Sequence, residues 1–265
     1  MKFKFDHDLH IHTHLSLCSN EPTQTTENLL RYAEDTGLKK ICFTDHFWDE
    51  TVPGASDWYK IQNFEHISQD MPLPKSDKVN VNFGCETELD KYFTLGVSSL
   101  NYDKFSFIII PTTHLHMNGF TIFDADIDNL EKRAELWCDR LEAVLNMDLP
   151  FHKVGIAHLA CDLMANNGDH LKVLSLLSEE RMRTLFTKAA KLGAGIELNF
   201  GDMSFKDQDA DIVLRPFRIA KECGCKFYCG SDTHEFPDGE GFRRVFERAI
   251  DLLDLKESDK IDFLK

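Results

Sequence analysis

Short apolar segments alternate with longer amphipathic segments along almost the whole chain, and this alternation limits the folds open to it. Seven segments have the length and apolar character of strands, and segments with helical spacing separate most of them. Parallel strands need a long crossover, usually a helix, so the alternation favours an α/β fold with a parallel sheet or barrel. The predicted strands are residues 8–12, 39–46, 79–86, 105–114, 153–158, 195–200 and 226–232.

The predicted helices carry recognisable signals at their ends. Residues 26–37 follow Thr25 or Thr26 as a cap and stop at Gly37, and residues 178–193 run from a Ser178 cap to a glycine stop. The segments 48–78 and 118–124 lack such signals and are predicted to be long loops, which in barrels frame the active site. Because no Gly-, Ser- or Pro-rich linker divides the chain, residues 1–265 are predicted to form one domain. Further helices are predicted at 126–146, 210–224 and 241–255.

Charge and composition narrow the partners of the chain. The formal net charge is -15, and such a surface repels nucleic acid and anionic membranes, so a small diffusible substrate is expected. No signal peptide or membrane-spanning apolar run is visible. The eight cysteines show no disulfide framework, which is typical of reduced thiols, so the expected location is the cytoplasm.

Histidines and acids stand where the predicted strands end. In a strand–helix barrel the carboxyl ends of all strands meet at one mouth, so these side chains should lie close together. Imidazole and carboxylate ligands together suit zinc, manganese or iron. The sequence therefore predicts a metal cluster at the mouth of the barrel. Its candidate ligands are His10, His12, His46, Glu86, His114, His158, Asp232 and His234.

The same residues carry a resemblance to a known family. The motifs DLHIHTH, FTDH, GCE, GIAH and GSDTH, with His114 between the third and fourth, resemble the ordered motifs of the polymerase and histidinol phosphatase (PHP) superfamily. The likeness runs from Asp8 to His234. It implies a distorted (β/α)7 TIM-like barrel that binds two or three divalent metals and hydrolyses phosphoesters. The length of the chain is similar to that of the stand-alone, histidinol-phosphatase-like branch.

The resemblance also implies how the ligands are shared among three metals. The first metal would be held by His10, His12, Glu86 and Asp232. Glu86 would bridge to a second metal completed by His114 and His158, and His46 and His234 would hold a third. Cys18 stands where trinuclear members place a histidine. Its thiolate could ligate the third metal, or Cys18 could be a small packed residue with Glu21 as the alternative ligand.

The expected reaction is hydrolysis of a small phosphate monoester, with histidinol phosphate as a named candidate. A hydroxide shared by two metals would attack phosphorus. Glu86 would link the metals, and Asp232 or His234 could protonate the leaving alcohol. Candidate substrate contacts are His14, His116, Lys206 and Arg215.

Three other functions remain open from the sequence. An amidohydrolase-type enzyme would bridge its metals with a carbamylated lysine, whereas here Glu86 ends the strand concerned. A nuclease or phosphodiesterase acting on nucleotides is disfavoured by the net charge of -15. A non-catalytic protein would carry a regulatory or structural metal site. Structural sites are usually closed and four-coordinate, which the larger ligand set does not match.

Overall fold

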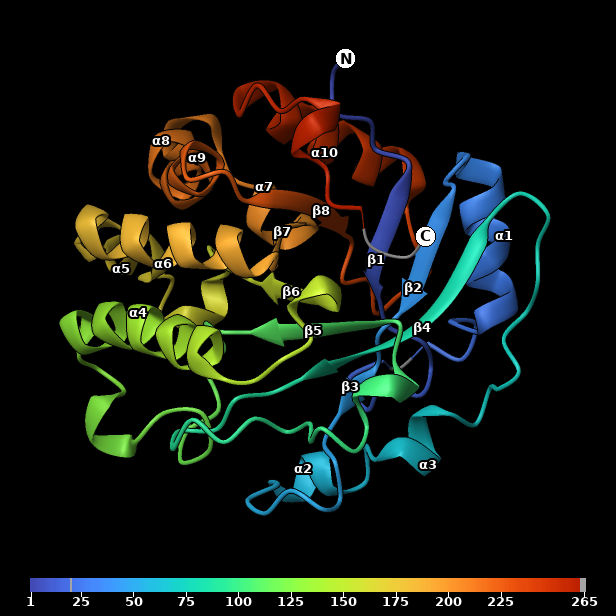
Figure 1. Cartoon of the computed structure of the whole chain (residues 1–265), viewed down its shortest axis with the longest axis horizontal. Helices are drawn as coiled ribbons and strands as arrows, with labels where there is room; N and C mark the ends of the chain where they lie inside the picture. Colours follow the sequence, from blue (N-terminus) through green and yellow to red (C-terminus); the bar gives the residue numbers. More distant parts are fainter. Residues whose placement is uncertain (20, 263–265) are drawn as a thin grey trace.

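The computed structural model describes residues 1–19 and 21–262, and its strands form one parallel sheet rolled into a barrel (Figure 1). The strand order is β1-β2-β4-β5-β6-β7-β8, with β3 paired to β4, and all paired strands run parallel. This confirms the predicted seven-stranded α/β barrel. The strands are β1 His7–Ile11, β2 Lys40–Phe43, β3 His46–Phe47, β4 Asn80–Thr87, β5 Phe107–Pro111, β6 Val154–Ala157, β7 Gly195–Asn199 and β8 Lys226–Gly230.

The second predicted strand is split into β2 and β3. Thr44 and Asp45 leave the ladder between the two pieces, and both pieces pair with β4. After this break the register places His46 directly opposite Glu86. Two candidate ligands from neighbouring strands are therefore adjacent because of backbone pairing alone.

The barrel closes between β1 and β8 at their carboxyl ends. The Asp232 N–H donates to the His10 carbonyl at 2.7 Å, and the His12 N–H donates to the Thr233 carbonyl at 3.2 Å. These bonds lie beside four candidate ligands and join the first and last strands where the predicted metal site lies.

At the opposite end of the barrel, other groups fill the gap between β1 and β8. His7 is buried, and its Nε2 accepts from the Cys229 N–H at 3.0 Å. The Ile261 N–H donates to the Phe227 carbonyl at 2.9 Å, so a segment near the carboxyl terminus extends the sheet beyond β8. At this end, bonds from a side chain and from a segment near the carboxyl terminus therefore take the place of ladder bonds between β1 and β8.

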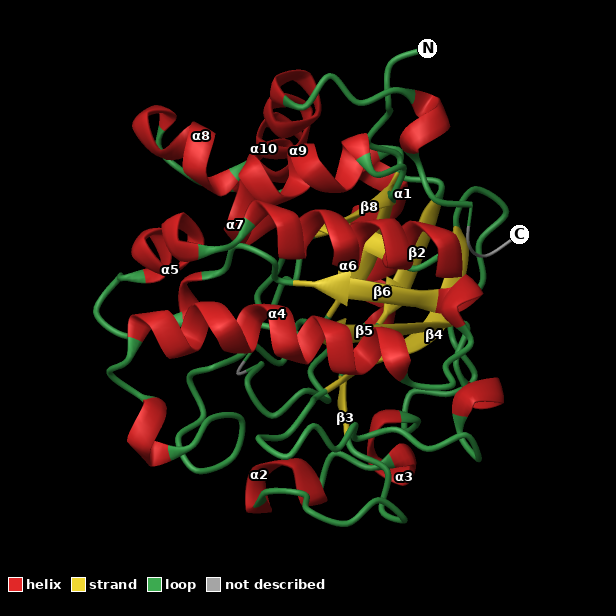
Figure 2. Ribbon diagram, turned by 60° about the vertical axis from the view of Figure 1, so that its left-hand side comes forward, coloured by secondary structure: helices red, strands yellow, loops and turns green. Residues whose placement is uncertain are grey.

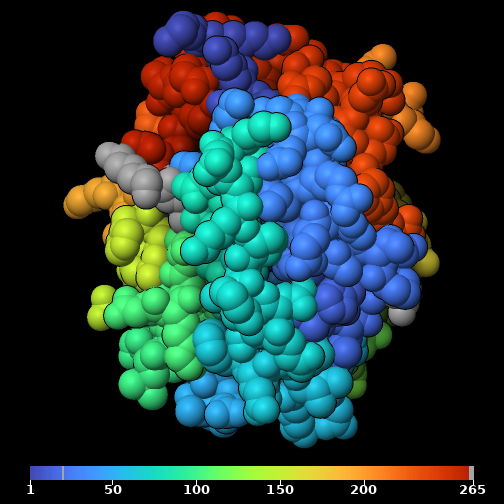
Figure 3. Space-filling model, turned by 90° about the vertical axis from the view of Figure 1, so that its right-hand side faces the viewer, coloured from blue at the N-terminus to red at the C-terminus, as the bar shows by residue number. Residues whose placement is uncertain are grey.

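Helices cover the outside of the barrel. In Figure 1, α4, α5 and α6 lie on one side and α1 on the other, and Figure 2 shows α4 and α6 side by side across β5 and β6. In Figure 3 the cyan segment after α2 lies against the blue amino-terminal part. Among the described residues, none of the helices is both long and apolar enough to cross a bilayer. The α-helices in the described part of the chain are α1 Thr26–Thr36, α2 Asp57–Lys60, α3 Phe64–Ile67, α4 Leu130–Asn146, α5 His170–Leu176, α6 Glu179–Leu192, α7 Phe200–Met203, α8 Ala210–Val213, α9 Arg215–Glu222 and α10 Gly239–Leu252.

The predicted helix ends agree with the structure at α1 and α6. Thr25, not Thr26, caps α1 by accepting from the Asn28 N–H, and Ser178 caps α6. Gly37 and Gly193 follow these helices with φ angles of 74° and 87°, a left-handed conformation that glycine adopts without a steric cost.

Several predicted boundaries need correction. The segment 210–224 forms two helices, because Pro216 belongs to the first turn of α9, where a missing N–H costs least. The strand predicted at 105–114 is shorter, so His114 lies three residues beyond β5. The segment 48–78 contains α2 and α3, and α5 was not predicted. The connection from β4 to β5 has only the 3-10 turn Tyr102–Lys104, so the strand–helix alternation is incomplete.

Apolar side chains also fill the inside of the barrel beneath the candidate ligands. This small cluster is separate from the main core between sheet and helices. Gly155 faces the Tyr228 hydroxyl and the Phe107 ring so closely that a Cβ would collide with both. The filled interior supports the site from below. The cluster consists of Leu9, Cys42, Phe107, Ile109, Ala157 and Tyr228.

Candidate metal centre

The predicted ligands meet at the carboxyl-terminal mouth of the barrel. Potential ligand atoms lie within 4.8 Å of one another in overlapping groups. Two of these groups consist of the residues that the family resemblance implies for the first and second metals. Three groups consist of predicted ligands alone: His10 with His12, Glu86 and Asp232; Glu86 with His114 and His158; and His12 with His46 and His234. Two others include residues that were not predicted as ligands: His10 with His158 and Glu197, and His158 with Cys161 and Asp202.

The first group has the spacing of ligands around one ion. The Nε2 atoms of His10 and His12 are 3.1 Å apart, and Asp232 Oδ1 is 3.1 Å from His12 Nε2. Glu86 Oε2 lies 3.5 Å from His10 Nε2 and 3.3 Å from His12 Nε2. Bonds of about 2.0–2.2 Å to one metal put neighbouring ligand atoms about 3.0–3.5 Å apart. The first group therefore fits a divalent metal.

His10 is held by a carboxylate that the sequence analysis did not single out. His10 Nδ1 donates to Glu197 Oε1 at 2.7 Å, and both side chains are fully buried. The carboxylate accepts the Nδ1 proton, so the Nε2 lone pair is left for a metal. A Cβ at Gly230 would collide with the Glu197 carboxylate and lie 2.5 Å from His10 Cβ. Glycine at this position makes the His10–Glu197 contact sterically accessible.

His12 is oriented through a hydroxyl. The Ser16 hydroxyl donates to Asp45 Oδ1 at 2.6 Å, so its oxygen is left to accept from His12 Nδ1 at 2.7 Å. These two hydrogen bonds fix the His12 ring and leave its Nε2 facing the other ligand atoms of the first group. Asp45, which directly precedes the candidate ligand His46, therefore influences His12 through Ser16.

The second group is built on Glu86. Both Glu86 oxygens are buried, and among the described residues neither has a hydrogen-bond partner, although Oε2 lies 2.9 Å from His46 Nδ1. Its Oε2 faces the first group, and its Oε1 lies 3.5 Å from His158 Nε2. The buried Nε2 of His114 also lacks a partner. A carboxylate placed between two groups of imidazoles fits a ligand that bridges two metals.

His114 is supported by a buried ion pair. Its Nδ1 donates to Glu88 Oε2 at 2.9 Å, and Arg140 donates to Glu88 Oε1 at 3.2 Å. The other guanidinium N–H groups of Arg140 bind the carbonyls of Thr112 and Leu89, among others. Arg140 on α4 therefore holds together the segments that follow β4 and β5, and through Glu88 it supports His114.

Two candidate ligands have unusual backbone conformations. His158 has φ of 62° and Asp232 has φ of 53°, in the left-handed region that non-glycine residues seldom adopt. Such conformations are concentrated at functional sites, where the surrounding structure holds them. Both residues follow the last strand residue closely, and the turn directs their side chains into the mouth.

Neighbouring charges and burial shift the pKa values of the candidate imidazole ligands in opposite directions. Burial lowers the pKa of His12, but Asp232 and Glu86 outweigh it and raise this pKa to about 9. Burial, assisted by His158, lowers the pKa of His114 to about 3. His114 is thus neutral and ready to ligate, whereas a metal must displace a proton from His12.

The third group differs from the expected set. In this group His12 stands beside His46 and His234, where Cys18 was expected. However, the Nε2 atom of His12 belongs to the first group, and its Nδ1 donates to Ser16. His234 Nδ1 donates to the Asp232 carbonyl at 2.8 Å, which leaves Nε2 free. Cys18 lines the adjoining cavity, whereas Glu21 bonds within its own loop to Thr23.

The mouth opens into a cavity of about 530 Å³. Of the four residues expected to contact substrate, His116 lines this cavity. The expected substrate contact of His14 needs correction. Strand β1 ends at Ile11 and the chain then turns, so the exposed His14 ring faces Asp70, with Nδ1 3.7 Å from Oδ2. The cavity floor is formed by His46, Glu86, His114, His158, Asp232 and His234.

Two further substrate candidates lie away from the cavity. Arg215 donates to the carbonyls of Leu174 and Leu177 and so ties the end of α5 to α9. Lys206 is exposed before the 3-10 turn Asp207–Asp209 and does not line the cavity. Their positions correct the expectation that either one grips phosphate.

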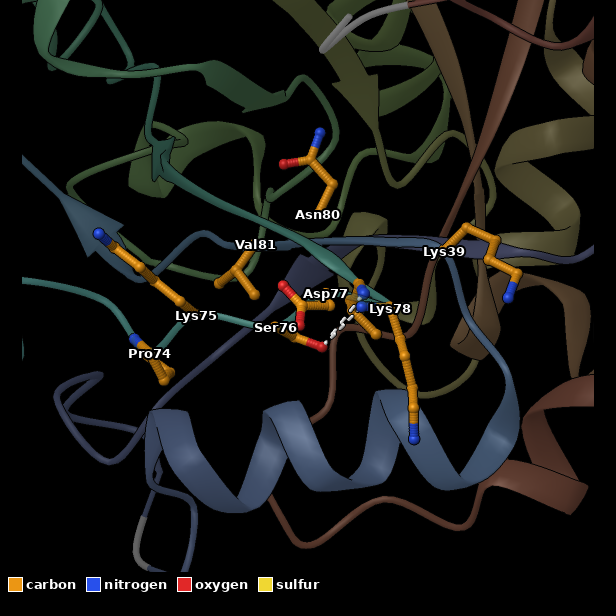
Figure 4. Close-up of a pocket in the computed structure, with 9 residues that line it drawn as sticks. Lys39, Pro74, Lys75, Ser76, Asp77, Lys78, Asn80 and Val81 are labelled. Carbon is orange, nitrogen blue, oxygen red and sulfur yellow. Dashed lines mark hydrogen bonds between the residues drawn. The ribbon is translucent and has the colours of Figure 1, made fainter.

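Another hollow, of about 600 Å³, lies at the amino-terminal ends of β2 and β4, away from the ligand-bearing mouth. Lys39, Lys75 and Lys78 line it, but Figure 4 shows their side chains pointing away from one another. They do not converge on a common point where an anion could bind.

The parallel barrel and the clustered histidine and carboxylate side chains at its mouth together define a protein with a candidate metal centre. The PHP domain family model matches residues 8–201, which is most of the chain. The chain belongs to the PHP domain family.

Two proteins are similar to this chain along most of its length. A Deinococcus radiodurans protein named "Probable histidinol-phosphatase" is 26% identical over 245 residues, covering 89% of this chain and 88% of the relative. The crystal structure of histidinol phosphate phosphatase from Lactococcus lactis subsp. lactis, complexed with zinc, L-histidinol and phosphate, superimposes with a TM-score of 0.57. That likeness covers 97% of this chain and 98% of the other at 16% identity, and it shows the shared fold.

Proposed function

We propose that this chain is a metal-dependent phosphoric ester hydrolase that acts on small phosphate monoesters. The observation that carries the proposal is Glu86, a buried carboxylate that stands between two groups of histidines and has no hydrogen-bond partner in the described part of the chain. Membership of the PHP domain family supports it. The ligand types suit two or three zinc, manganese or iron ions.

When bound, a pair of such metals supplies charge neutralisation on the phosphoryl oxygens and a water activated near neutral pH. The protein contributes orientation. Glu197 and Ser16 fix His10 and His12, and Glu88 fixes His114. A buried set of rings held in this way needs little rearrangement when metal and substrate bind.

The proton-donor role expected for Asp232 and His234 is weaker than their ligand role. Burial raises the pKa of Asp232, but His10 and other neighbouring rings hold it well below its usual range. Burial, assisted by His12, lowers the pKa of His234 to about 3. Both groups are therefore deprotonated at neutral pH, as metal ligands must be.

Histidinol phosphate is the first candidate substrate because the Lactococcus lactis enzyme is complexed with L-histidinol and phosphate. Nucleotides and nucleic acid are weaker candidates, since the chain carries a net charge of -15. An amidohydrolase-type site would need a bridging lysine, and Glu86 occupies that place.

We further propose a third, weaker metal site on His46 and His234, with the Cys18 thiolate as its remaining protein ligand. His12 cannot serve it, because both of its ring nitrogens are already used. The ligands come from residues 10–234, so we propose that the chain acts as one domain. The described cysteines are all free, which fits the reducing cytoplasm.

Elemental analysis and a substrate panel test the proposed function. Wild-type protein should hold about two or more metals per chain and hydrolyse at least one of histidinol phosphate, aryl phosphates and nucleotides. Glu86→Ala should lose metal and lower kcat/KM by more than the roughly 10–100-fold typical of residues behind the ligands. Glu222→Ala, at an exposed ion pair with Arg183, is the control. Fewer than about one metal per chain, without rescue by zinc or manganese, would reject the proposal.

A further inference from the structure

The cavity above the ligands has an aromatic wall. Trp58 and Tyr59 come from α2, and Phe120 comes from the segment after β5. Met117 and Leu163 also line the cavity. These five side chains adjoin the ligand groups in one continuous hollow, so any group attached to a phosphate at the metal centre would lie against them.

Ring contacts connect this wall to the metal centre. The Trp58 ring is 5.1 Å from the His46 ring and 4.8 Å from the Tyr59 ring, in edge-to-face geometry. Tyr59 is 5.5 Å from Phe120 and 5.8 Å from the buried Trp48. Tyr59 is only 1% exposed, whereas Trp58 is 37% exposed. Buried Tyr59 and Trp48 therefore support the wall from the protein interior, and the indole of Trp58 is the part exposed to a bound substrate.

Fixed positive charge is absent from the described residues that line the cavity. Among the described residues that line it, none is lysine or arginine, and its acids, Glu86 and Asp232, are candidate metal ligands. The buried Arg133 and Arg140 on α4 bind backbone carbonyls and Glu88 instead. A phosphate can be neutralised by metals, but a second anionic group on the substrate would be desolvated there without a partner.

We propose that this cavity selects phosphate monoesters whose leaving group carries an aromatic ring and no second anionic group. The inference rests on the proposed phosphoesterase function and names its substrate class. The ring packs on Trp58, and Met117 supplies a polarisable contact. Aromatic packing favours such a substrate over an aliphatic one, and the missing cation disfavours carboxylated and doubly phosphorylated ones.

A matched series of substrates tests this selection. The esters 2-phenylethyl phosphate, n-butyl phosphate and 3-carboxypropyl phosphate all release a primary alkanol, so their intrinsic reactivities are similar. Wild-type enzyme should show roughly tenfold higher kcat/KM for the phenylethyl ester than for the butyl ester. The carboxypropyl ester should be the poorest of the three.

Variants assign the preference to the wall. Trp58→Ala should bring the phenylethyl-to-butyl ratio close to one, and Trp58→Phe should retain most of it. Tyr92→Ala is the control, since Tyr92 is 70% exposed and lies outside the cavity. Equal wild-type kcat/KM values for the two esters, or an unchanged ratio in Trp58→Ala, would overturn the inference and leave the phosphoesterase function standing. No turnover of any ester would instead reject the function.

Binding gives a readout without turnover. Trp48 and Trp137 are buried, so Trp58 is the exposed tryptophan of the three in the chain. The non-hydrolysable 2-phenylethylphosphonate should change tryptophan fluorescence in the metal-loaded wild type, and Trp58→Ala should abolish that change. An unaltered wild-type signal at saturating phosphonate, judged by competitive inhibition, would contradict packing on Trp58.

Discussion

Glu197→Gln tests whether metal affinity depends on the residue behind His10. Glu197 Oε1 accepts from His10 Nδ1 at 2.7 Å, while Oε2 accepts from the His158 N–H and from Asn199 Nδ2, both at 3.3 Å. Glutamine has nearly the same shape but only one acceptor oxygen. If that oxygen faces His10, the amide NH2 lies against two other donors, the His158 N–H and the Asn199 amide. If the amide is flipped, its NH2 faces His10 Nδ1 and drives the ring proton to Nε2.

Either orientation weakens the first metal site. Loss of such a supporting carboxylate typically lowers metal affinity by about 10–100-fold, which corresponds to about 1.4–2.7 kcal/mol. We expect a loss within this range for Glu197→Gln, because His10 is 0% exposed and its ring has no solvent-exposed alternative partner. The assay is competition for zinc between the protein and a chromophoric chelator at fixed pH.

The control is Glu222→Gln, which removes a charge from an exposed pair with Arg183 and should leave zinc affinity unchanged. Thermal unfolding of the metal-free variants separates lost affinity from lost folding. If folded Glu197→Gln binds zinc as tightly as wild type, the orientation of His10 by Glu197 does not matter for binding, and the reasoning fails.

Three further predictions use other parts of the site. Because folded His12 keeps its proton to a pKa of about 9, against 6.5 as its ordinary value, metal-free protein should lose stability from pH 6.5 to 9. Zinc-loaded protein should gain Tm relative to it over that range, and parallel Tm curves would contradict this. Arg140→Met should lower the free energy of unfolding by about 3–5 kcal/mol, measured in urea, because buried Glu88 loses its charge partner. Cys18→Ala should lower a stoichiometry of three metals to two, measured by elemental analysis, and Cys18→His should restore the third.

The sequence by itself indicated the barrel and most of the candidate ligands. Apolar segments of strand length alternate with amphipathic segments, and both patterns are local properties of the chain. In a parallel barrel all strand ends face the same way, so a residue such as Glu86 or His158 could be assigned to the mouth without coordinates. Ligands on six different strands or their ends were thereby predicted to be neighbours.

Residues behind the ligands were harder to find. Glu197 lies 187 positions from His10, and its signal in the sequence is a single acid in the apolar strand 195–200. A charged residue in a buried strand needs a partner, but the sequence does not say which one. The choice of His10 depends on barrel closure and on the space left by Gly230.

Turns and surface positions were also decided by tertiary structure. His14 shares the spacing of His10 and His12, yet the chain leaves the strand after Ile11, so side-chain alternation no longer applies. Arg215 was a candidate for phosphate binding because of its charge, and it instead bonds carbonyls at the end of α5. The sequence determined the strand pattern and the ligand types, because these follow from local periodicity and side-chain chemistry. Which side chains orient the ligands and line the cavity was decided only by the tertiary structure, because strand register, barrel closure and turns bring together residues far apart in the chain.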